Sequence, residues 1–113
     1  MEESRLSSSH RLAEVTRYFD LASQADTGSY FAQFTEDATV EDEGVRRRGI
    51  DDIRTWRTEV PRVAYTVHDI VAADSGHDAH VDIAGDFPGS PVRLTFHFEF
   101  TANDHIVALD IHP

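Results

Sequence analysis

The stretch Val92–Thr101, which reads VRLTFHFEFT, alternates between apolar and polar residues over its whole length. One set of alternate positions carries Val92, Leu94, Phe96, Phe98 and Phe100. The other set carries Arg93, Thr95, His97, Glu99 and Thr101. Because successive side chains of a strand point to opposite faces of a sheet, this pattern predicts a strand with one buried and one polar face. The buried face then needs other elements to cover it.

Three further strands are predicted around this one, over residues 63–73, 80–87 and 107–112. Val81, Ile83, Gly85 and Phe87 share one face of the second, and Val107, Leu109 and Ile111 share one face of the last. The strands are separated by the turn-forming stretches Asp74-Ser75-Gly76, Pro88-Gly89-Ser90-Pro91 and Ala102-Asn103-Asp104. Short turns join antiparallel neighbours, so the second half of the chain predicts an antiparallel meander.

The first half of the chain has helical periodicity instead. Leu12, Val15, Phe19 and Ala22 recur at helical spacing and predict a buried stripe, which Tyr18 borders. The run Ser7-Ser8-Ser9 offers N-cap oxygens for this helix.

Two shorter helices and a short strand are predicted next. Asp26–Ser29 breaks the first helix and precedes a second one, whose aromatic face is Tyr30, Phe31 and Phe34. Residues 39–42 are predicted to form a short strand and residues 43–49 a charged loop. A third helix follows and ends at Pro61. Its expected inward residues are Ile50, Ile53, Trp56 and Val60.

Helices followed by strands predict a single α+β domain over residues 1–113. The three helices are the only available cover for the apolar sheet face. A curved antiparallel sheet that wraps around the N-terminal helices would form a cone with a pocket inside it.

Composition and charge narrow the function classes. The chain has 113 residues and no cysteine, which excludes disulfides, thiolate metal sites and cysteine nucleophiles. The formal net charge is −11, so the surface repels phosphate, and neither nucleic acid nor an anionic membrane is an expected partner. No apolar run reaches the roughly 20 residues that a membrane span needs. The N-terminus does not resemble a signal peptide, and a cytoplasmic location is expected.

Tyr18 and Asp42 are the first catalytic candidates, since both stand among apolar, inward-facing residues. A carboxylate in an apolar pocket can act as a general base beside a carbonyl. A phenol hydroxyl can hold the carbonyl oxygen as negative charge develops there. The alternatives are an exposed carboxylate at a strand end for Asp42 and a core tyrosine bonded to the backbone for Tyr18.

Histidines and a second acid give weaker signals. His68 is a third catalytic candidate on the predicted strand 63–73, with a surface histidine as the alternative. His97 and Asp110 are expected on outward strand faces. His77 and His80 lack a third ligand, so no metal site is predicted. The chain also contains no glycine-rich phosphate loop and no nucleophile elbow.

Several stretches together resemble the nuclear transport factor 2-like superfamily over nearly the whole chain. Arg17-Tyr18 is similar to the segment with the catalytic tyrosine of ketosteroid isomerase. Phe34–Asp42, which reads FTEDATVED, is similar to the segment that ends in its catalytic aspartate. Gly49, Ile53 and Trp56 match the third helix, and His97–Phe100 matches the central strand. The resemblance implies a cystatin-like α+β roll, of the SnoaL-like or ketosteroid isomerase-like kind.

That resemblance implies an isomerase, cyclase or dehydratase that moves a proton next to a carbonyl without a cofactor. Asp42 would be the base and Tyr18 the hydrogen-bond donor, and a pocket histidine in dehydratase-like relatives suggests His68. Two positions depart from the isomerase. Phe96 stands where it has a protonated aspartate, and Arg57 stands where it has a supporting tyrosine. A less demanding reaction than a steroid double-bond shift is therefore expected.

The expected ligand is a small apolar or aromatic carbonyl compound. Its predicted pocket is lined by Phe34, Trp56, Phe87, Phe96, Phe98 and Leu109. The alternative function is a non-catalytic ligand-binding or dimerisation module of the same fold, because this fold hosts enzymes and non-enzymes alike. In either case a homodimer through the outer sheet face is expected.

Overall fold

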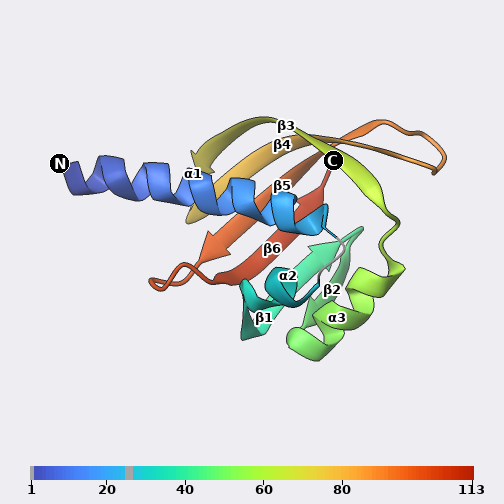
Figure 1. Cartoon of the computed structure of the whole chain (residues 1–113), viewed down its shortest axis with the longest axis horizontal. Helices are drawn as coiled ribbons and strands as arrows, with labels where there is room; N and C mark the ends of the chain where they lie inside the picture. The colour runs from blue at the N-terminus through green and yellow to red at the C-terminus, as the bar shows by residue number, and fades with distance from the viewer. Residues whose placement is uncertain (1, 25–26) are drawn as a thin grey trace.

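The structure, a computed structural model, describes residues 2–24 and 27–113, with side chains described from residue 10 onward. The helices pack against a single curved sheet (Figure 1). The elements in chain order are α1 (Glu2–Ala22), α2 (Gly28–Ala32), β1 (Phe34–Asp42), β2 (Val45–Arg48), α3 (Ile50–Glu59), β3 (Val63–Ala73), β4 (Gly76–Gly85), β5 (Val92–Phe100) and β6 (Ile106–His112). The predicted α+β class is confirmed.

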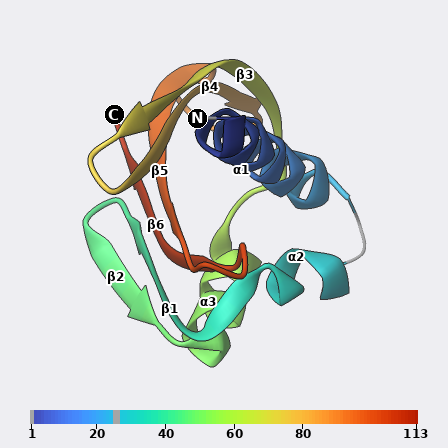
Figure 2. The same ribbon diagram turned by 90° about the vertical axis from the view of Figure 1, so that its left-hand side faces the viewer.

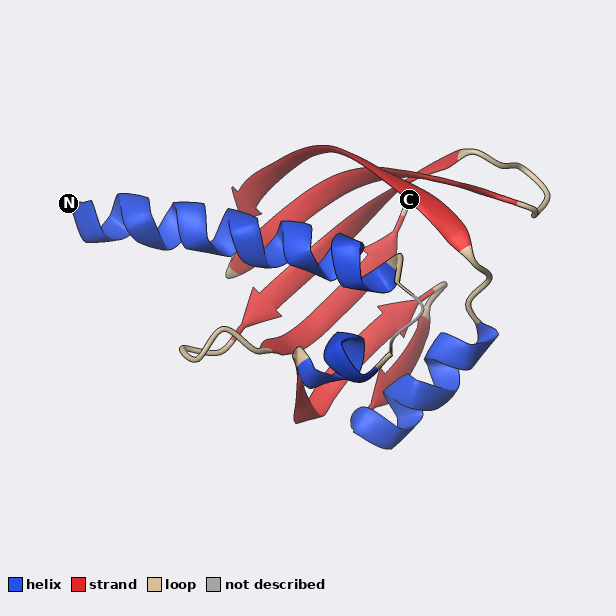
Figure 3. Cartoon of the chain, in the orientation of Figure 1, coloured by secondary structure: helices blue, strands red, loops and turns tan. Residues whose placement is uncertain are grey.

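The strands form one six-stranded sheet in the order β2-β1-β6-β5-β4-β3. Strands β3 to β6 are consecutive antiparallel neighbours, so the predicted meander is confirmed. Strand β1 extends this sheet by pairing in parallel with β6, and β2 pairs antiparallel with β1 (Figure 3). The parallel pairing places Asp42, at the end of β1, beside Ile111 of β6.

The prediction of a charged loop over residues 43–49 is wrong, because Val45–Arg48 forms strand β2. Glu43 and Gly44 make a two-residue turn in which both residues have positive φ, at 53° and 77°. Such a turn has the twist that a tight hairpin needs, and glycine adopts this conformation at little cost. β1 is also longer than the predicted strand, since it already begins at Phe34 rather than leaving that residue in the second helix.

Helix α1 differs from the prediction in its start and in one buried position. It is helical from Glu2, so Ser7-Ser8-Ser9 lie within the helix and are not N-caps. Val15, Tyr18 and Phe19 are buried, as the periodicity indicates, but the side chain of Leu12 is 40% exposed. At its N-terminal end α1 extends past the strands (Figure 1).

Strand β6 shows a shift of register that the alternation did not reveal. Phe98 pairs with Leu109, whereas Phe100 pairs with Ile106, which leaves one extra residue on β6. Ile106 is therefore buried and Val107 is not, contrary to the predicted inward set. A bulge of this kind changes which face a residue occupies.

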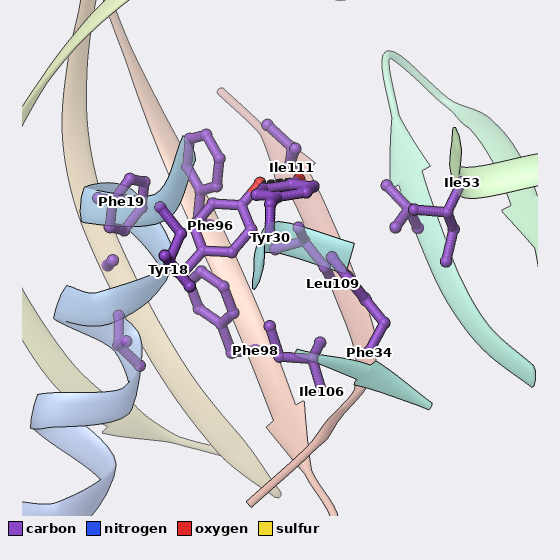
Figure 4. Close-up of a cluster of buried hydrophobic side chains, with 14 of the residues drawn as sticks. Tyr18, Phe19, Tyr30, Phe34, Ile53, Phe96, Phe98, Ile106, Leu109 and Ile111 are labelled. Atoms are coloured by element: carbon purple, nitrogen blue, oxygen red, sulfur yellow. Dashed lines mark hydrogen bonds between the residues drawn. The ribbon is translucent and has the colours of Figure 1, made fainter. Parts of the chain in front are cut away.

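The core lies between α1 and the inner face of the sheet, which curves around the helix when viewed from its end (Figure 2). Tyr18 packs edge-on against Phe98 with ring centroids 5.1 Å apart, and Phe19 packs in the same way against Phe96 at 5.1 Å. Figure 4 shows these rings gathered beside Tyr30 and Phe34. The predicted inward residues Ile53 and Trp56 of α3 are buried as well. In the part of the chain that is described, no helix is long and apolar enough to span a membrane.

Candidate functional site

A cavity of about 240 Å³ lies inside the cone, beside α3 and the inner faces of β3 to β6. Its walls are mainly apolar. Its polar lining residues are Tyr18, Asp42, Glu43, Arg57 and Tyr65. Ligand pockets usually begin near ~300 Å³, so a cavity of this size suits a ring-sized molecule. The structure thus brings the candidates Tyr18 and Asp42 to one cavity.

Asp42 is half-buried at the last position of β1, immediately before the tight turn to β2. The indole Nε1 of Trp56 donates a hydrogen bond to Asp42 Oδ2 at 3.1 Å. Within the described residues, no hydrogen bond reaches the other carboxylate oxygen, Oδ1. The indole therefore holds one oxygen of a carboxylate that lines the cavity.

Tyr18 donates to or accepts from Tyr30, with the two hydroxyl oxygens 2.8 Å apart. Both side chains are buried, and burial raises the pKa of Tyr18 well above its usual value. Burial raises the pKa of Tyr30 too. Both phenols are neutral at physiological pH and can donate. When Tyr30 donates to Tyr18, the Tyr18 hydroxyl hydrogen is free for a ligand oxygen.

Arg57 projects from α3 next to this phenol pair. Its Nη2 donates to the backbone oxygen of Ala22 at 2.9 Å, and its guanidinium carbon lies 4.5 Å from the centre of the Tyr30 ring. Its Nη1 lies 3.4 Å from the hydroxyl of Tyr65. The sequence indicated Arg57 only as a departure from a supporting tyrosine. Neither Tyr30 nor Tyr65 was predicted as a site residue, although Tyr65 alternates with Val63 and Val67 on one strand face.

A model of the SnoaL-like domain family matches residues 15–109 of the chain. The chain belongs to the SnoaL-like family. It is 31% identical to a candidate polyketide cyclase from Sinorhizobium meliloti, with 88% of this chain and 94% of that chain covered and a TM-score of 0.81.

Two more distant structures share the fold of this SnoaL-like chain. One is a protein from Catenulispora acidiphila with a ketosteroid isomerase-like fold, in complex with trimethylamine (16% identity, 88% and 84% coverage, TM-score 0.73). The other is the epoxide hydrolase/cyclase-like enzyme SalBIII of pyran ring formation in salinomycin (18% identity, 93% and 91% coverage, TM-score 0.71). A search of curated proteins found no match. The predicted superfamily and the cone-shaped roll are confirmed.

Three of the six residues predicted to line the pocket of this SnoaL-like chain lie at the cavity, and three do not. Trp56, Phe87 and Phe96 line the cavity. Phe34, Phe98 and Leu109 are buried in the core and do not line it. Rings already occupy the space beside two of these residues: Tyr18 packs on Phe98, and Tyr30 packs on Phe34 with centroids 5.6 Å apart. These contacts confine the cavity to the end of the cone near α3.

His68 does not lie with Tyr18 and Asp42. It follows Val67 at a register shift between β3 and β4, does not line the cavity, and its side chain is 39% exposed. Its Nε2 lies 2.8 Å from Asp82 Oδ2 and 2.9 Å from Arg93 Nη2. Hydrogen bonds from Arg93 and then His68 lower the pKa of Asp82 to about 2. The geometry therefore corresponds to the alternative reading, a surface histidine.

The outer sheet face carries further histidine–carboxylate pairs. His97 lies 2.6 Å from Asp78 through Nδ1 and 3.0 Å from Glu99 through Nε2. Partial burial lowers the pKa of His97, but these two hydrogen bonds outweigh it and the net shift is upward. Among the side chains that the structure describes, no three ligands are grouped to hold a metal ion. The homodimer through this face stays a prediction.

Proposed function

We propose that this SnoaL-like chain transfers a proton at a carbon next to a carbonyl group of a small, largely apolar molecule. The observation that carries the proposal is the shared cavity of Tyr18 and Asp42, a hydroxyl donor and a carboxylate on mainly apolar walls. A general base and a donor for the carbonyl oxygen are the two groups that enolisation requires.

In the proposed step, a carboxylate oxygen of Asp42 takes a proton from the carbon beside the carbonyl. The electron pair of that C–H bond forms the enolate double bond, and the carbonyl π electrons move to oxygen. The Tyr18 hydroxyl donates a hydrogen bond to that oxygen. Asp42 then returns the proton to another carbon in an isomerisation. In a cyclisation, the enolate carbon attacks a second carbonyl instead, the π electrons of that carbonyl move to its oxygen, and this oxygen takes the proton from Asp42.

The magnitude of oxyanion stabilisation favours an easily enolised substrate. A single well-placed donor contributes about 3 kcal/mol to the transition state. Phe96 lines the cavity where the resemblance places the second donor of the isomerase, and a phenylalanine ring cannot donate. A carbonyl activated by conjugation or by a second carbonyl needs less stabilisation. The 31% identity to the candidate polyketide cyclase favours the same kind of compound.

Asp42 also borders a second, smaller hollow of about 170 Å³, which shares Asp42, Glu43, Trp56, Val60 and Pro61 with the cavity. Its other walls include Arg47 and Glu59, an ion pair 2.8 Å apart whose glutamate is mostly exposed. A base next to such a hollow can exchange its proton with solvent. Solvent deuterium should therefore appear in the substrate.

Deuterium exchange tests the proposal without knowledge of the final product. The protein is incubated in D₂O with benzylideneacetone, a planar enone whose methyl protons lie next to the carbonyl, and loss of the methyl signal is followed by proton NMR. We expect exchange above the buffer rate in the wild type and none above it in Asp42→Asn.

The control variant is Asp37→Asn, because Asp37 is an exposed acid on the same strand and is not among the cavity residues. It should exchange at the wild-type rate. Equal exchange by Asp42→Asn and the wild type would remove Asp42 from the mechanism. Benzylideneacetone that binds without any exchange would favour the non-catalytic binding module.

A further inference from the structure

We propose that Arg57 is the binding site for a carboxylate of the ligand, so that the substrate class is an apolar carbonyl compound that also carries an acid group. This inference rests on the proposed function in one respect, namely that Tyr18 and Asp42 would hold the carbonyl group of the same ligand. The anion-binding part concerns Arg57 alone and is testable without turnover.

The position of the guanidinium is fixed from three sides. The bond from Nη2 to Ala22 ties it to the end of α1, the ring of Tyr30 covers one of its faces, and Tyr65 lies beside Nη1. These contacts come from three separate elements. A guanidinium held in this way loses little freedom when a ligand binds, which favours affinity.

The charge of Arg57 has no partner of opposite sign in the described part of the chain, where no carboxylate oxygen lies within 4.0 Å of its nitrogens. The chain has 21 acids for 10 arginines, and Arg11, Arg47 and Arg93 each have a carboxylate partner. Arg57 is half-buried, and its hydrogen bonds and ring contact among the described residues are with a backbone oxygen and two phenols. Buried charges in proteins are normally paired, so this cation is suited to an anion from outside.

The phenols do not compensate the charge at neutral pH. Burial lowers the pKa of Arg57, and the neighbouring tyrosines Tyr30, Tyr18 and Tyr65 outweigh burial and raise it. Their charge contribution requires ionised phenols, which exist only at strongly alkaline pH. At pH 7 the groups that contact the guanidinium, namely Tyr30, Tyr65 and the backbone oxygen of Ala22, are therefore neutral.

Donors remain for a ligand as well. A guanidinium has five N–H groups, and the hydrogen bonds found among the described residues use one on Nη1 and one on Nη2. The remaining donors belong to a side chain that lines the cavity. Carboxylates match the planar fork of arginine and are its preferred small anions.

The test compares two ligands of nearly the same shape by calorimetry. The two differ in one group, since cinnamate carries a carboxylate where benzylideneacetone carries a methyl ketone. We expect the wild type to bind cinnamate more tightly. Because a hydrogen bond to a charged group is lost, Arg57→Met should lower the affinity for cinnamate about 10- to 100-fold. Benzylideneacetone affinity should stay unchanged, which shows that the cavity is intact.

Arg57→Lys retains the charge and should keep part of the preference for cinnamate. In the wild type, added KCl should lower the affinity for cinnamate and leave the affinity for benzylideneacetone unchanged. This measurement tests the inference even if the variants do not fold. Cinnamate binding no tighter than benzylideneacetone in the wild type, or an equal loss for both ligands in Arg57→Met, would overturn the inference. Asp42→Asn separates the two proposals, since it abolishes exchange and leaves the Arg57-dependent preference for cinnamate.

Discussion

The hydroxyl oxygens of Tyr18 and Tyr30 lie 2.8 Å apart in the core and join α1 to α2. The Tyr30 ring is in turn covered by the guanidinium of Arg57. Only Tyr18 of the two phenols lines the cavity. Tyr30 therefore holds the Tyr18 hydroxyl in a defined position at the cavity wall, and the two should differ in their effect on catalysis.

Replacing Tyr18 by phenylalanine should lower the rate of deuterium exchange into benzylideneacetone by about 100- to 1000-fold, the usual effect of losing one oxyanion donor. Tyr30→Phe should cause a smaller loss, because the Tyr18 hydroxyl stays in the cavity but loses its fixed orientation. The measurement is the NMR exchange rate at saturating ligand. A larger loss in Tyr30→Phe than in Tyr18→Phe would contradict this assignment.

The two buried phenols should also make the fold sensitive to alkali. Their pKa values are raised in the folded state, chiefly by burial, so the unfolded chain ionises first, near pH 10. Stability from this source is fully present below pH 10 and is lost as pH rises further. The loss should be about 1.4 kcal/mol per pH unit for each tyrosine.

Urea unfolding followed by far-ultraviolet circular dichroism from pH 8 to 11.5 measures this dependence. The control is the double variant Tyr18→Phe/Tyr30→Phe, whose stability should fall less steeply above pH 10. A wild-type profile that is flat above pH 10 would show that these hydroxyls ionise in the folded state without cost.

The sequence was sufficient for the fold class, and two of its catalytic candidates, Tyr18 and Asp42, line the cavity. Periods of two and of 3.6 residues separated the strands from the helices, and the resemblance of Phe34–Asp42 indicated Asp42. The hydrogen bond from Trp56 to Asp42 was beyond such reasoning. It joins α3 to the end of β1, and its geometry depends on how the helix packs on the strand. The contacts of Arg57 were beyond the sequence for the same reason, since they come from three other elements.

Local charge and irregular strand pairing explain two wrong predictions, the loop over residues 43–49 and the inward position of Val107. Arg46-Arg47-Arg48 has the composition of a loop, but Arg46 pairs with Glu41 at 3.1 Å across the hairpin and Arg47 with Glu59 on α3. These ion pairs, one across the hairpin and one to α3, offset the positive charge of the arginines, so the segment can form a strand. In β6 the bulge moves Ile106 to the buried face, and a strict alternation cannot anticipate an inserted residue.

His68→Gln should leave the rate of deuterium exchange unchanged and should change the pKa of Asp82 instead. Asp82 has a pKa of about 2 because Arg93 and His68 donate hydrogen bonds to it. Without His68 the pKa of Asp82 should rise toward its ordinary value, and Arg93→Gln should raise it further because Arg93 makes the larger contribution. Carboxyl carbon NMR measures both shifts. A loss of exchange in His68→Gln would return this histidine to the list of catalytic candidates.

Gly76→Ala should destabilise the sheet more than Gly44→Ala does. A methyl group at Gly76 would lie 2.0 Å from the backbone oxygen of Phe98, so β4 and β5 would have to separate. Overpacking against a backbone that cannot yield costs up to about 3 kcal/mol. Urea unfolding of the variant, with Trp56 fluorescence as the signal, gives the change in the free energy of unfolding.

Gly44→Ala is the matched control, because a methyl group there has no atom within 4 Å and only the positive φ of 77° opposes it. The strain of an alanine in that conformation costs about 1 kcal/mol. A steric cause predicts the larger loss at Gly76, where φ is unexceptional. Equal losses in the two variants would mean that β5 shifts freely away from β4, and the close approach at Phe98 would then carry no energetic weight.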